Sequence, residues 1–305
     1  MYDIVIIGSG PAGLSSAIYA QRAGLRAVVI EKNYFGTGQI AESERVDNYP
    51  GLYGENGFDL GEKFRTHAES LGAEFLEGEV VKISKKDADY GILLDNGSAL
   101  DTHTIIYAVG TERRKLGVEG EKEFSGRGVS YCAVCDGAFY RDKITAVAGG
   151  GDTALGDAVL LSKFAKKVYL IHRRDKFRAN KTLQQRVENI PNVEILLDSQ
   201  ITKISGTNKV EKITVLQKGE SKEIDADGVF VAVGSVPNSA IIKDLVDIDK
   251  NGYIIADEDG VTSAQGIFVA GDVRTKKLRQ VVTAVSDGAN CVLSAEEYLQ
   301  KNYGY

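Results

Sequence analysis

Two short glycine-rich segments, each lying between an apolar run and a helix-like stretch, constrain the fold of this chain more than any other feature. The first runs from Gly8 to Gly13, and the second runs from Gly149 to Ala154. Such a turn after a strand lets backbone N–H groups and a helix N-terminus meet a pyrophosphate. Strand, turn, helix and second strand form a βαβ unit of roughly 30 residues. The sequence therefore predicts an α/β protein with two Rossmann-like, doubly wound nucleotide-binding domains.

The elements around both segments follow the order of that unit. Strands are predicted at Ile4–Ile7 and Ala27–Ile30 around a helix at Leu14–Ala23, and again at Lys143–Ala148 and Lys167–Ile171 around a helix at Ala154–Phe164. Later strand-like runs are Val193–Leu197, Lys212–Gln217, Gly228–Val233, Asp247–Ala256 and Gly266–Val269, and a helix is predicted within Gln280–Tyr298. The charged stretch Lys82–Asp89 is interpreted as a solvated turn.

The segment Gly266–Asp272 resembles the closing piece of a flavoprotein domain, although it lies far beyond the second glycine-rich segment. We therefore expect the second domain to be inserted in the first, with crossings near Thr111–Gly117 and Pro237–Leu245. The predicted boundaries give a first domain of residues 1–113 and 242–305, and an inserted domain of residues 114–241.

Composition excludes several classes of protein. The 305 residues are 43% hydrophobic and 26% charged, with a net charge of −6. This balance is that of a globular protein, and it lacks the basic surface that nucleic-acid binding needs. Since no run approaches ~20 apolar residues, no membrane span is predicted. The start, Met1-Tyr2-Asp3, lacks the basic region of a signal peptide, so we expect a cytoplasmic protein.

The residue that ends the second strand differs between the two domains. Glu31 lies 18 positions beyond Gly13, where an acid accepts ribose hydroxyls and rejects a 2′-phosphate. Arg173 lies 19 positions beyond Ala154, and Arg174 and Arg178 follow it. Arginines there favour a 2′-phosphate, although a solvated basic turn is the simpler alternative. We expect an unphosphorylated dinucleotide in the first domain and NADP(H) in the second.

Between the two glycine-rich segments lies a Cys-x-x-Cys motif formed by Cys132 and Cys135. A structural zinc site needs four ligands, and Cys291 and the histidines provide no second pair, so no metal is expected. The spacing instead suits a redox-active disulfide. Asp136 follows directly and could deliver the proton that dithiol release needs, with an ordinary Asp-Gly turn as the alternative.

Together these residues resemble the bacterial low-molecular-weight thioredoxin reductases over nearly the whole chain. The most specific matches are the runs Cys132–Gly137 and His172–Ala179. The other matching residues are Gly8–Gly13, Glu31, Gln39, Asn48–Gly51, Ala108–Gly110, Gly149–Ala154, Gly271–Arg274 and Leu278–Val281.

The resemblance implies a role for each matching group. FAD would be held by Gly8, Gly10, Pro11, Ala12, Gly13, Glu31, Gln39, Asn48, Gly110, Gly271, Asp272, Arg279, Gln280 and Val281. NADP(H) would be held by Gly149, Gly151, Asp152, Thr153, Ala154, His172, Arg173, Arg174 and Arg178. Cys135 would face the flavin, Cys132 would exchange with thioredoxin, and Asp136 would be the acid. The family also implies a homodimer.

Departures from the family's pattern concern the cofactor loops. Thr37 stands where the family has a glycine, Gly156 stands where it has an acid, and Val118-Glu119-Gly120 lacks the usual proline. The expected reaction runs from NADPH through FAD and the dithiol to thioredoxin, with rotation of one domain against the other. Alternatives are a reductase that uses another donor, such as ferredoxin, or another small dithiol protein. A non-catalytic flavin redox sensor is a further alternative.

Overall fold

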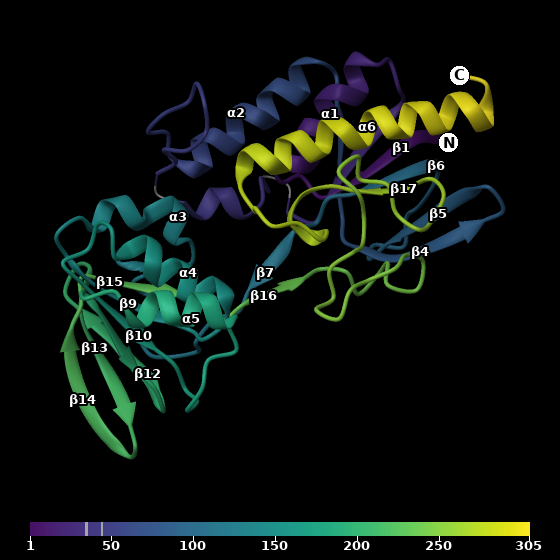
Figure 1. Cartoon of the computed structure of the whole chain (residues 1–305). Helices are drawn as coiled ribbons and strands as arrows, with labels where there is room; N and C mark the ends of the chain where they lie inside the picture. The colour runs from purple at the N-terminus through teal and green to yellow at the C-terminus, as the bar shows by residue number, and fades with distance from the viewer. Residues whose placement is uncertain (34–35, 44) are drawn as a thin grey trace. The chain divides into compact units, whose positions relative to one another are not determined.

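The computed structural model describes residues 1–33, 36–43 and 45–305. The chain divides into two compact units (Figure 1). Unit 1 consists of Met1–Glu112 and Val236–Tyr305, and unit 2 is the continuous segment Arg113–Ser235. Unit 2 is therefore inserted in unit 1. The strands at the two crossings, β7 (Thr111–Arg113) and β16 (Ser235–Pro237), pair with each other.

Unit 1 is built on one mixed sheet whose strand order is β3-β2-β1-β6-β5-β4, with β17 also paired to β6. Its strands are β1 (Tyr2–Ile7), β2 (Ala27–Glu31), β3 (Glu74–Glu77), β4 (Val80–Lys86), β5 (Asp89–Leu94), β6 (Ala99–Tyr107) and β17 (Ile267–Val269). Strands β3, β2, β1, β6 and β17 are parallel, whereas β4 and β5 add an antiparallel hairpin at one edge. The carboxyl ends of the parallel strands thus lie at one edge of the sheet.

Apolar side chains cover both faces of this sheet. Its helices are α1 (Pro11–Arg22), α2 (Gly57–Ser70), α6 (Val281–Tyr303), and the short 3-10 helices η1 (Gln39–Glu42) and η3 (Gly271–Val273). Helices α1 and α6 pack on one face, and Gly288 permits their close approach because a Cβ there would lie 2.2 Å from the Ala12 carbonyl oxygen. Ile242, Val246 and Ile254 cover the other face.

Unit 2 has a fully parallel sheet with strand order β11-β10-β9-β15-β8. These strands are β8 (Val129–Ser130), β9 (Ile144–Ala148), β10 (Lys167–Ile171), β11 (Val193–Leu196) and β15 (Gly228–Val231). The antiparallel strands β12 (Ser199–Gly206), β13 (Val210–Gln217) and β14 (Glu220–Asp225) form a second sheet. The helices are α3 (Ala133–Asp136), η2 (Gly137–Tyr140), α4 (Asp152–Leu161) and α5 (Lys181–Glu188).

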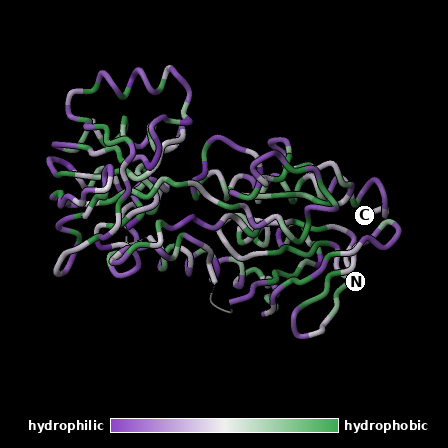
Figure 2. Tube along the Cα trace, turned by 90° about the horizontal axis from the view of Figure 1, so that it is seen from below, coloured by the Kyte–Doolittle hydropathy of each residue, from purple (hydrophilic) through white to green (hydrophobic). Residues whose placement is uncertain are grey.

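The predicted class of fold is confirmed: each unit contains a parallel sheet with a βαβ unit around its glycine-rich turn. The hydropathy-coloured trace shows hydrophobic segments mostly inside each unit and hydrophilic segments at many outer turns (Figure 2). No helix in the described part of the chain is long and apolar enough to cross a membrane.

Two expectations about local structure were wrong. Asp247–Ala256 is no strand, because a turn interrupts it: the Asp249 carboxylate accepts hydrogen bonds from the N–H groups of Asn251 and Tyr253. Lys82–Asp89 is mostly strand β4, because Ile83 is buried while the charged side chains beside it stay at the surface. Only the residues around Asp87, which has a φ of 52°, form a turn.

Candidate dinucleotide and redox sites

The first glycine-rich turn connects β1 to α1 in a way that only glycine allows. Gly8 has a φ of +102°, and a Cβ on it would lie 2.7 Å from the Ala108 carbonyl oxygen. A Cβ on Gly13 would lie 1.8 Å from the Gly8 carbonyl oxygen. Helix α1 begins at Pro11, and its N-cap, Gly10, has no side chain that could cap the first N–H groups of the helix. The helix N-terminus therefore presents backbone N–H groups of the kind that bind a pyrophosphate.

Glu31 ends β2 beside this turn. Its Oε2 atom accepts hydrogen bonds from the Ser9 backbone N–H and the Ser9 hydroxyl, both at 2.9 Å. The structure thus brings the predicted ribose-binding acid to the turn that would hold the phosphates. The sequence analysis did not single out Ser9, because only the glycines around it belong to the dinucleotide-binding pattern.

A second glycine-containing loop touches the first. Gly38 has a φ of +77°, and a Cβ on it would lie 2.9 Å from the Gly10 Cα. Gln39 donates a side-chain hydrogen bond to the Thr111 carbonyl oxygen. Thr37 is buried, with 1% of its surface exposed. The β-branched residue that departs from the family's pattern is therefore accommodated by packing rather than exposed.

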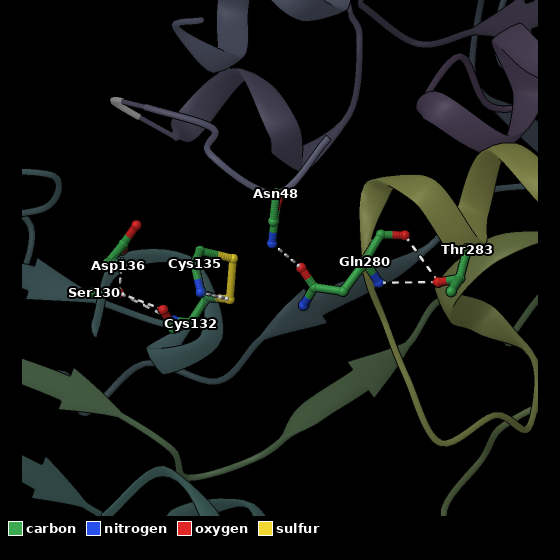
Figure 3. Close-up of a disulfide and its surroundings, with 7 residues drawn as sticks. All are labelled: Asn48, Ser130, Cys132, Cys135, Asp136, Gln280 and Thr283. Atoms are coloured by element: carbon green, nitrogen blue, oxygen red, sulfur yellow. Dashed lines mark hydrogen bonds between the residues drawn. A yellow bond between two sulfur atoms is a disulfide. The ribbon is translucent and has the colours of Figure 1, made fainter. Parts of the chain in front are cut away.

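The N-terminus of α6 carries the last group of predicted flavin-binding residues. Gln280 is the N-cap and forms a capping box with Thr283, and its Oε1 accepts a hydrogen bond from Asn48 Nδ2 at 2.8 Å (Figure 3). Arg279 stacks over the Tyr253 ring at 4.2 Å, and its Nε lies 3.4 Å from the Asp272 carbonyl oxygen. Unit 1 thus brings Asn48 to Gln280, which is distant in sequence, and Arg279 to the nearby Asp272.

Other predicted flavin-binding positions have backbone roles. Gly110 has a φ of +63° and accepts a hydrogen bond from the Asn238 N–H at 3.2 Å. Gly271 begins η3 with a φ of +78°, and its N–H donates to Asp287 at 2.9 Å. Val281 is the first residue of α6. These contacts place turns at the ends of β6 and β17, on the same edge of the sheet as the first glycine-rich turn.

The second glycine-rich turn, in unit 2, repeats the geometry of the first. A Cβ on Gly149 would lie 2.3 Å from the Ala232 carbonyl oxygen, and its φ is +154°. Helix α4 begins at Asp152, and its N-cap, Gly151, has no side chain that could cap the first N–H groups of the helix. The Asp152 carboxylate accepts hydrogen bonds from the backbone and side-chain N–H groups of Asn180, both at 2.8 Å. Asp152 therefore ties this turn to the start of α5.

The arginine-rich loop is held against that turn. The Arg178 N–H donates to the Gly150 carbonyl oxygen at 2.7 Å. The His172 ring is buried, stacks on Phe177 and lies where a Cβ on Gly150 would fall. Burial lowers the pKa of His172, which favours the neutral ring. The three arginines of this loop, Arg173, Arg174 and Arg178, are exposed. The loop is thus anchored by its histidine and presents its arginines to solvent.

Cys132 and Cys135 form a disulfide, with their Cα atoms 5.3 Å apart (Figure 3). Cys132 is the N-cap of α3, and its Sγ accepts a hydrogen bond from the Cys135 N–H at 3.2 Å. Backbone N–H groups directed at a sulfur favour its thiolate form after reduction. The third cysteine, Cys291, is fully buried, and burial raises the pKa of its thiol. No cluster in the described part of the chain could hold a metal ion.

Ser130, a residue that the sequence analysis missed, connects the Asp136 carboxylate to the backbone of Cys132. The Asp136 Oδ2 accepts a hydrogen bond from the Ser130 hydroxyl at 2.5 Å. The Ser130 Oγ also accepts a hydrogen bond from the Cys132 N–H at 3.1 Å. A serine two residues before the motif was a possible signal, because serine side chains commonly bond backbone groups two residues ahead.

Two dinucleotide turns and a dithiol define a class of flavin- and nicotinamide-linked oxidoreductases. The Pyridine nucleotide-disulphide oxidoreductase family matches residues 2–288, and the chain belongs to this family. A protein of Bacillus subtilis named thioredoxin reductase is 41% identical over 304 residues, covering 99% of this chain and 96% of that protein. One of Treponema pallidum with the same name is 41% identical over 301 residues, covering 98% and 97%.

Solved structures give the same result. A crystal structure of thioredoxin reductase from Streptococcus pyogenes has a TM-score of 0.94 and 41% identity, and the match covers 99% of both chains. The thioredoxin reductase from Giardia duodenalis has a TM-score of 0.92 and 36% identity, and that match covers 98% of both chains. The similarity therefore extends over both units.

Proposed function

We propose that this chain is a thioredoxin-disulfide reductase that uses NADPH as donor, FAD as relay and the Cys132–Cys135 pair as the group that reduces oxidised thioredoxin. The observation that carries the proposal is the disulfide at the N-terminus of α3, in the same unit as a dinucleotide turn and an arginine-rich loop. The full-length similarity to proteins named thioredoxin reductase supports it.

We assign FAD to residues 1–113 and 242–305. The uncapped N-terminus of α1 and the close approach of Gly8 to the backbone of Ala108 fit a pyrophosphate. The Glu31 carboxylate at the end of β2 fits a ribose that carries no 2′-phosphate. The chemistry supplied by bound FAD is the relay of an electron pair between a nicotinamide and a disulfide.

We assign NADP(H) to residues 114–241. Gly149, Gly151 and the N-terminus of α4 would bind the pyrophosphate, and Arg173 and its neighbouring arginines would bind the 2′-phosphate. Because Asp152 is engaged by Asn180 and the His172 ring is buried, their part in this site would be to shape the loop.

The residues of α3 divide the thiol chemistry between them. After reduction, the Cys132 thiolate attacks one sulfur of the thioredoxin disulfide, and the electron pair of the broken S–S bond passes to the leaving sulfur. The Asp136 carboxylic acid gives its proton to that sulfur and becomes a carboxylate. The Cys135 thiolate then attacks Cys132, which restores the disulfide and releases the second thioredoxin sulfur.

This proposal requires unit 2 to present two of its own sites in turn, the dinucleotide turn and the disulfide. Because the chain crosses between the units only twice, at β7 and β16, a rotation about these paired strands would serve. A disulfide engineered across the two units that left turnover intact would contradict the rotation. We further propose a homodimer, as in the family that the sequence resembles, which light scattering of the purified protein would test.

The deciding experiment is anaerobic stopped-flow spectroscopy of the FAD-loaded protein, followed by steady-state reduction of a bacterial thioredoxin. We expect NADPH to bleach the flavin absorbance faster than NADH, and thioredoxin to be reduced with NADPH as donor. Replacing Cys135 by Ser should leave bleaching by NADPH and abolish thioredoxin reduction. Bleaching without turnover on any thioredoxin would instead support a redox sensor or a reductase of another dithiol protein.

A further inference from the structure

Ser130 links the candidate acid to the candidate nucleophile. It is the last residue of β8, is 5% exposed, and lies in register with Phe230 of β15. Its hydroxyl lies 2.5 Å from Asp136 Oδ2 and 3.1 Å from the Cys132 backbone nitrogen (Figure 3). A buried side chain on a sheet strand therefore touches the carboxylate and the backbone of the reactive cysteine at once.

The bonding capacity of a hydroxyl group determines the direction of these contacts. The Ser130 hydroxyl has one proton to donate and accepts the Cys132 N–H with a lone pair. The Cys132 carbonyl oxygen is the more distant acceptor, at 3.4 Å, so the proton is donated to Asp136 Oδ2. The serine is thereby fixed on both sides.

We propose that Ser130 is a positioning residue for the dithiol reaction. It holds Asp136 Oδ2 as a hydrogen-bond acceptor, so that the transferable proton is carried by Oδ1, and it fixes that carboxyl group relative to Cys132. This inference rests on the proposed thioredoxin reduction, in which Asp136 is the acid. Ser130 itself gains and loses no proton during the step.

The proton balance of the step is simple. The proton leaves Oδ1 of the Asp136 carboxylic acid for the thiolate released from thioredoxin, and Oδ1 is reprotonated from water in the next cycle. With a donor on Oδ2, the ionised carboxylate is favoured and the acid gives up its proton more readily. Loss of the serine hydroxyl should therefore slow proton delivery and move the pH dependence to higher pH.

The elements packed against α3 also carry titratable groups. These elements include α4 and η2. They contribute Asp152 and Asp157 from α4 and Tyr140 from η2. Because Asp157 titrates near neutral pH, with its pKa raised to about 7 by burial, the pH experiment includes an Asp157→Asn background.

The test uses the FAD-loaded full chain, reduced by two electrons and mixed with oxidised bacterial thioredoxin between pH 5 and 9. We expect Ser130→Ala to lower the single-turnover rate about 10-fold, which is a fraction of the full effect of a general acid. The falling limb of its pH–rate profile should move to higher pH by about one pH unit. Ser130→Thr keeps the hydroxyl and should stay within about 3-fold of wild type. Ser162→Ala, at a serine elsewhere in unit 2, is the control.

A double-mutant cycle separates positioning from a structural role. If Ser130 acts through Asp136, Ser130→Ala added to Asp136→Asn changes the rate less than about 2-fold. Additive losses, or equal rates and pH profiles for wild type and Ser130→Ala, would overturn the inference while the proposed function stands. If the wild-type protein reduces no thioredoxin, both this inference and the proposed function are overturned. The pH–rate profile of the wild type is therefore measured first. Flavin bleaching by NADPH checks that each variant is folded.

Discussion

The side chain of Thr37 occupies the space that a side chain on Gly61 would need. A Cβ built on Gly61 of α2 would lie 2.4 Å from Thr37 Oγ1 and 2.6 Å from Thr37 Cβ. The residue that departs from the family's flavin-loop pattern thus packs against a helix position where only glycine fits. The loop and the helix are matched to each other in this chain.

We therefore expect Gly61→Ala to displace the loop around Thr37. Overpacking of this kind costs about 1–3 kcal/mol, so the free energy of unfolding of the apoprotein should fall by that amount and FAD should bind more weakly. Urea unfolding and fluorescence titration with FAD measure the two effects. Thr37→Gly in the same chain removes both Thr37 Oγ1 and Thr37 Cβ, which makes room for the new methyl group, and should recover most of the loss. A Gly61→Ala variant that is as stable as wild type would contradict the packing argument.

Discrimination between the two nicotinamide cofactors should depend on the arginine-rich loop. Removing one guanidinium from a charged phosphate costs about 1.5–3 kcal/mol, so Arg173→Ala should raise the KM for NADPH at least 10-fold. The kcat/KM for NADH, which has no 2′-phosphate, should change little. Arg186→Ala, at an exposed arginine of α5 in the same unit, is the matched control. Equal losses with both cofactors would refute a 2′-phosphate site at Arg173.

Local sequence patterns were sufficient to predict the βαβ units. The apolar runs that became β1, β2, β9 and β10 are short and continuous, and the glycines between strand and helix are required by the backbone itself. The disulfide was also predictable, because the Cys-x-x-Cys spacing suits a redox disulfide and the remaining Cys291 and histidines provide no second pair of zinc ligands. These features depend on neighbours in sequence.

Contacts between distant residues could not be predicted in this way. Thr37 and Gly61 are far apart in the chain, and their fit depends on how α2 lies against the loop. Ser130 is only six residues from Asp136, but their contact depends on the direction of the Asp136 side chain at the end of α3. His172 was expected to bind cofactor with its arginine neighbours, and only the packed structure shows its ring buried against Gly150.

Asp157 on α4 should make stability depend on pH. Burial raises its pKa to about 7, whereas an unfolded chain has an ordinary aspartate pKa near 3.8. Because the folded state favours the protonated form, its stabilising contribution is present below about pH 4 and is lost as pH rises through 7. Asp157→Asn should thus gain stability over wild type at pH 8, by at most about 4 kcal/mol, and little at pH 4.

Urea unfolding of the apoprotein at both pH values measures this difference. Asp225→Asn, at an exposed aspartate of β14 in the same unit, is the matched control. A constant difference between Asp157→Asn and wild type from pH 4 to 8 would mean that the carboxyl group is already ionised throughout that range in the folded protein.

The carboxylate of Asp287 on α6 holds the turn that begins at Gly271. It accepts hydrogen bonds from the Gly271 N–H at 2.9 Å, from Arg274 at 2.8 and 3.0 Å, and from Lys276 at 2.6 Å. The side chains of Arg274, Lys276 and Asp287 are all at most 6% exposed. Asp287→Ala would therefore leave two buried cations without their shared anion.

We expect that loss to cost about 3–5 kcal/mol of unfolding free energy, the usual effect of removing one partner from a buried ion pair. FAD binding should weaken as well, because the freed turn carries Asp272. Glu258→Ala is the matched control: Glu258 also pairs with Arg274, but its side chain is 92% exposed. An exposed partner contributes at most about 1 kcal/mol. Urea unfolding of both variants measures the contrast, and equal losses would show that burial does not set the strength of this network.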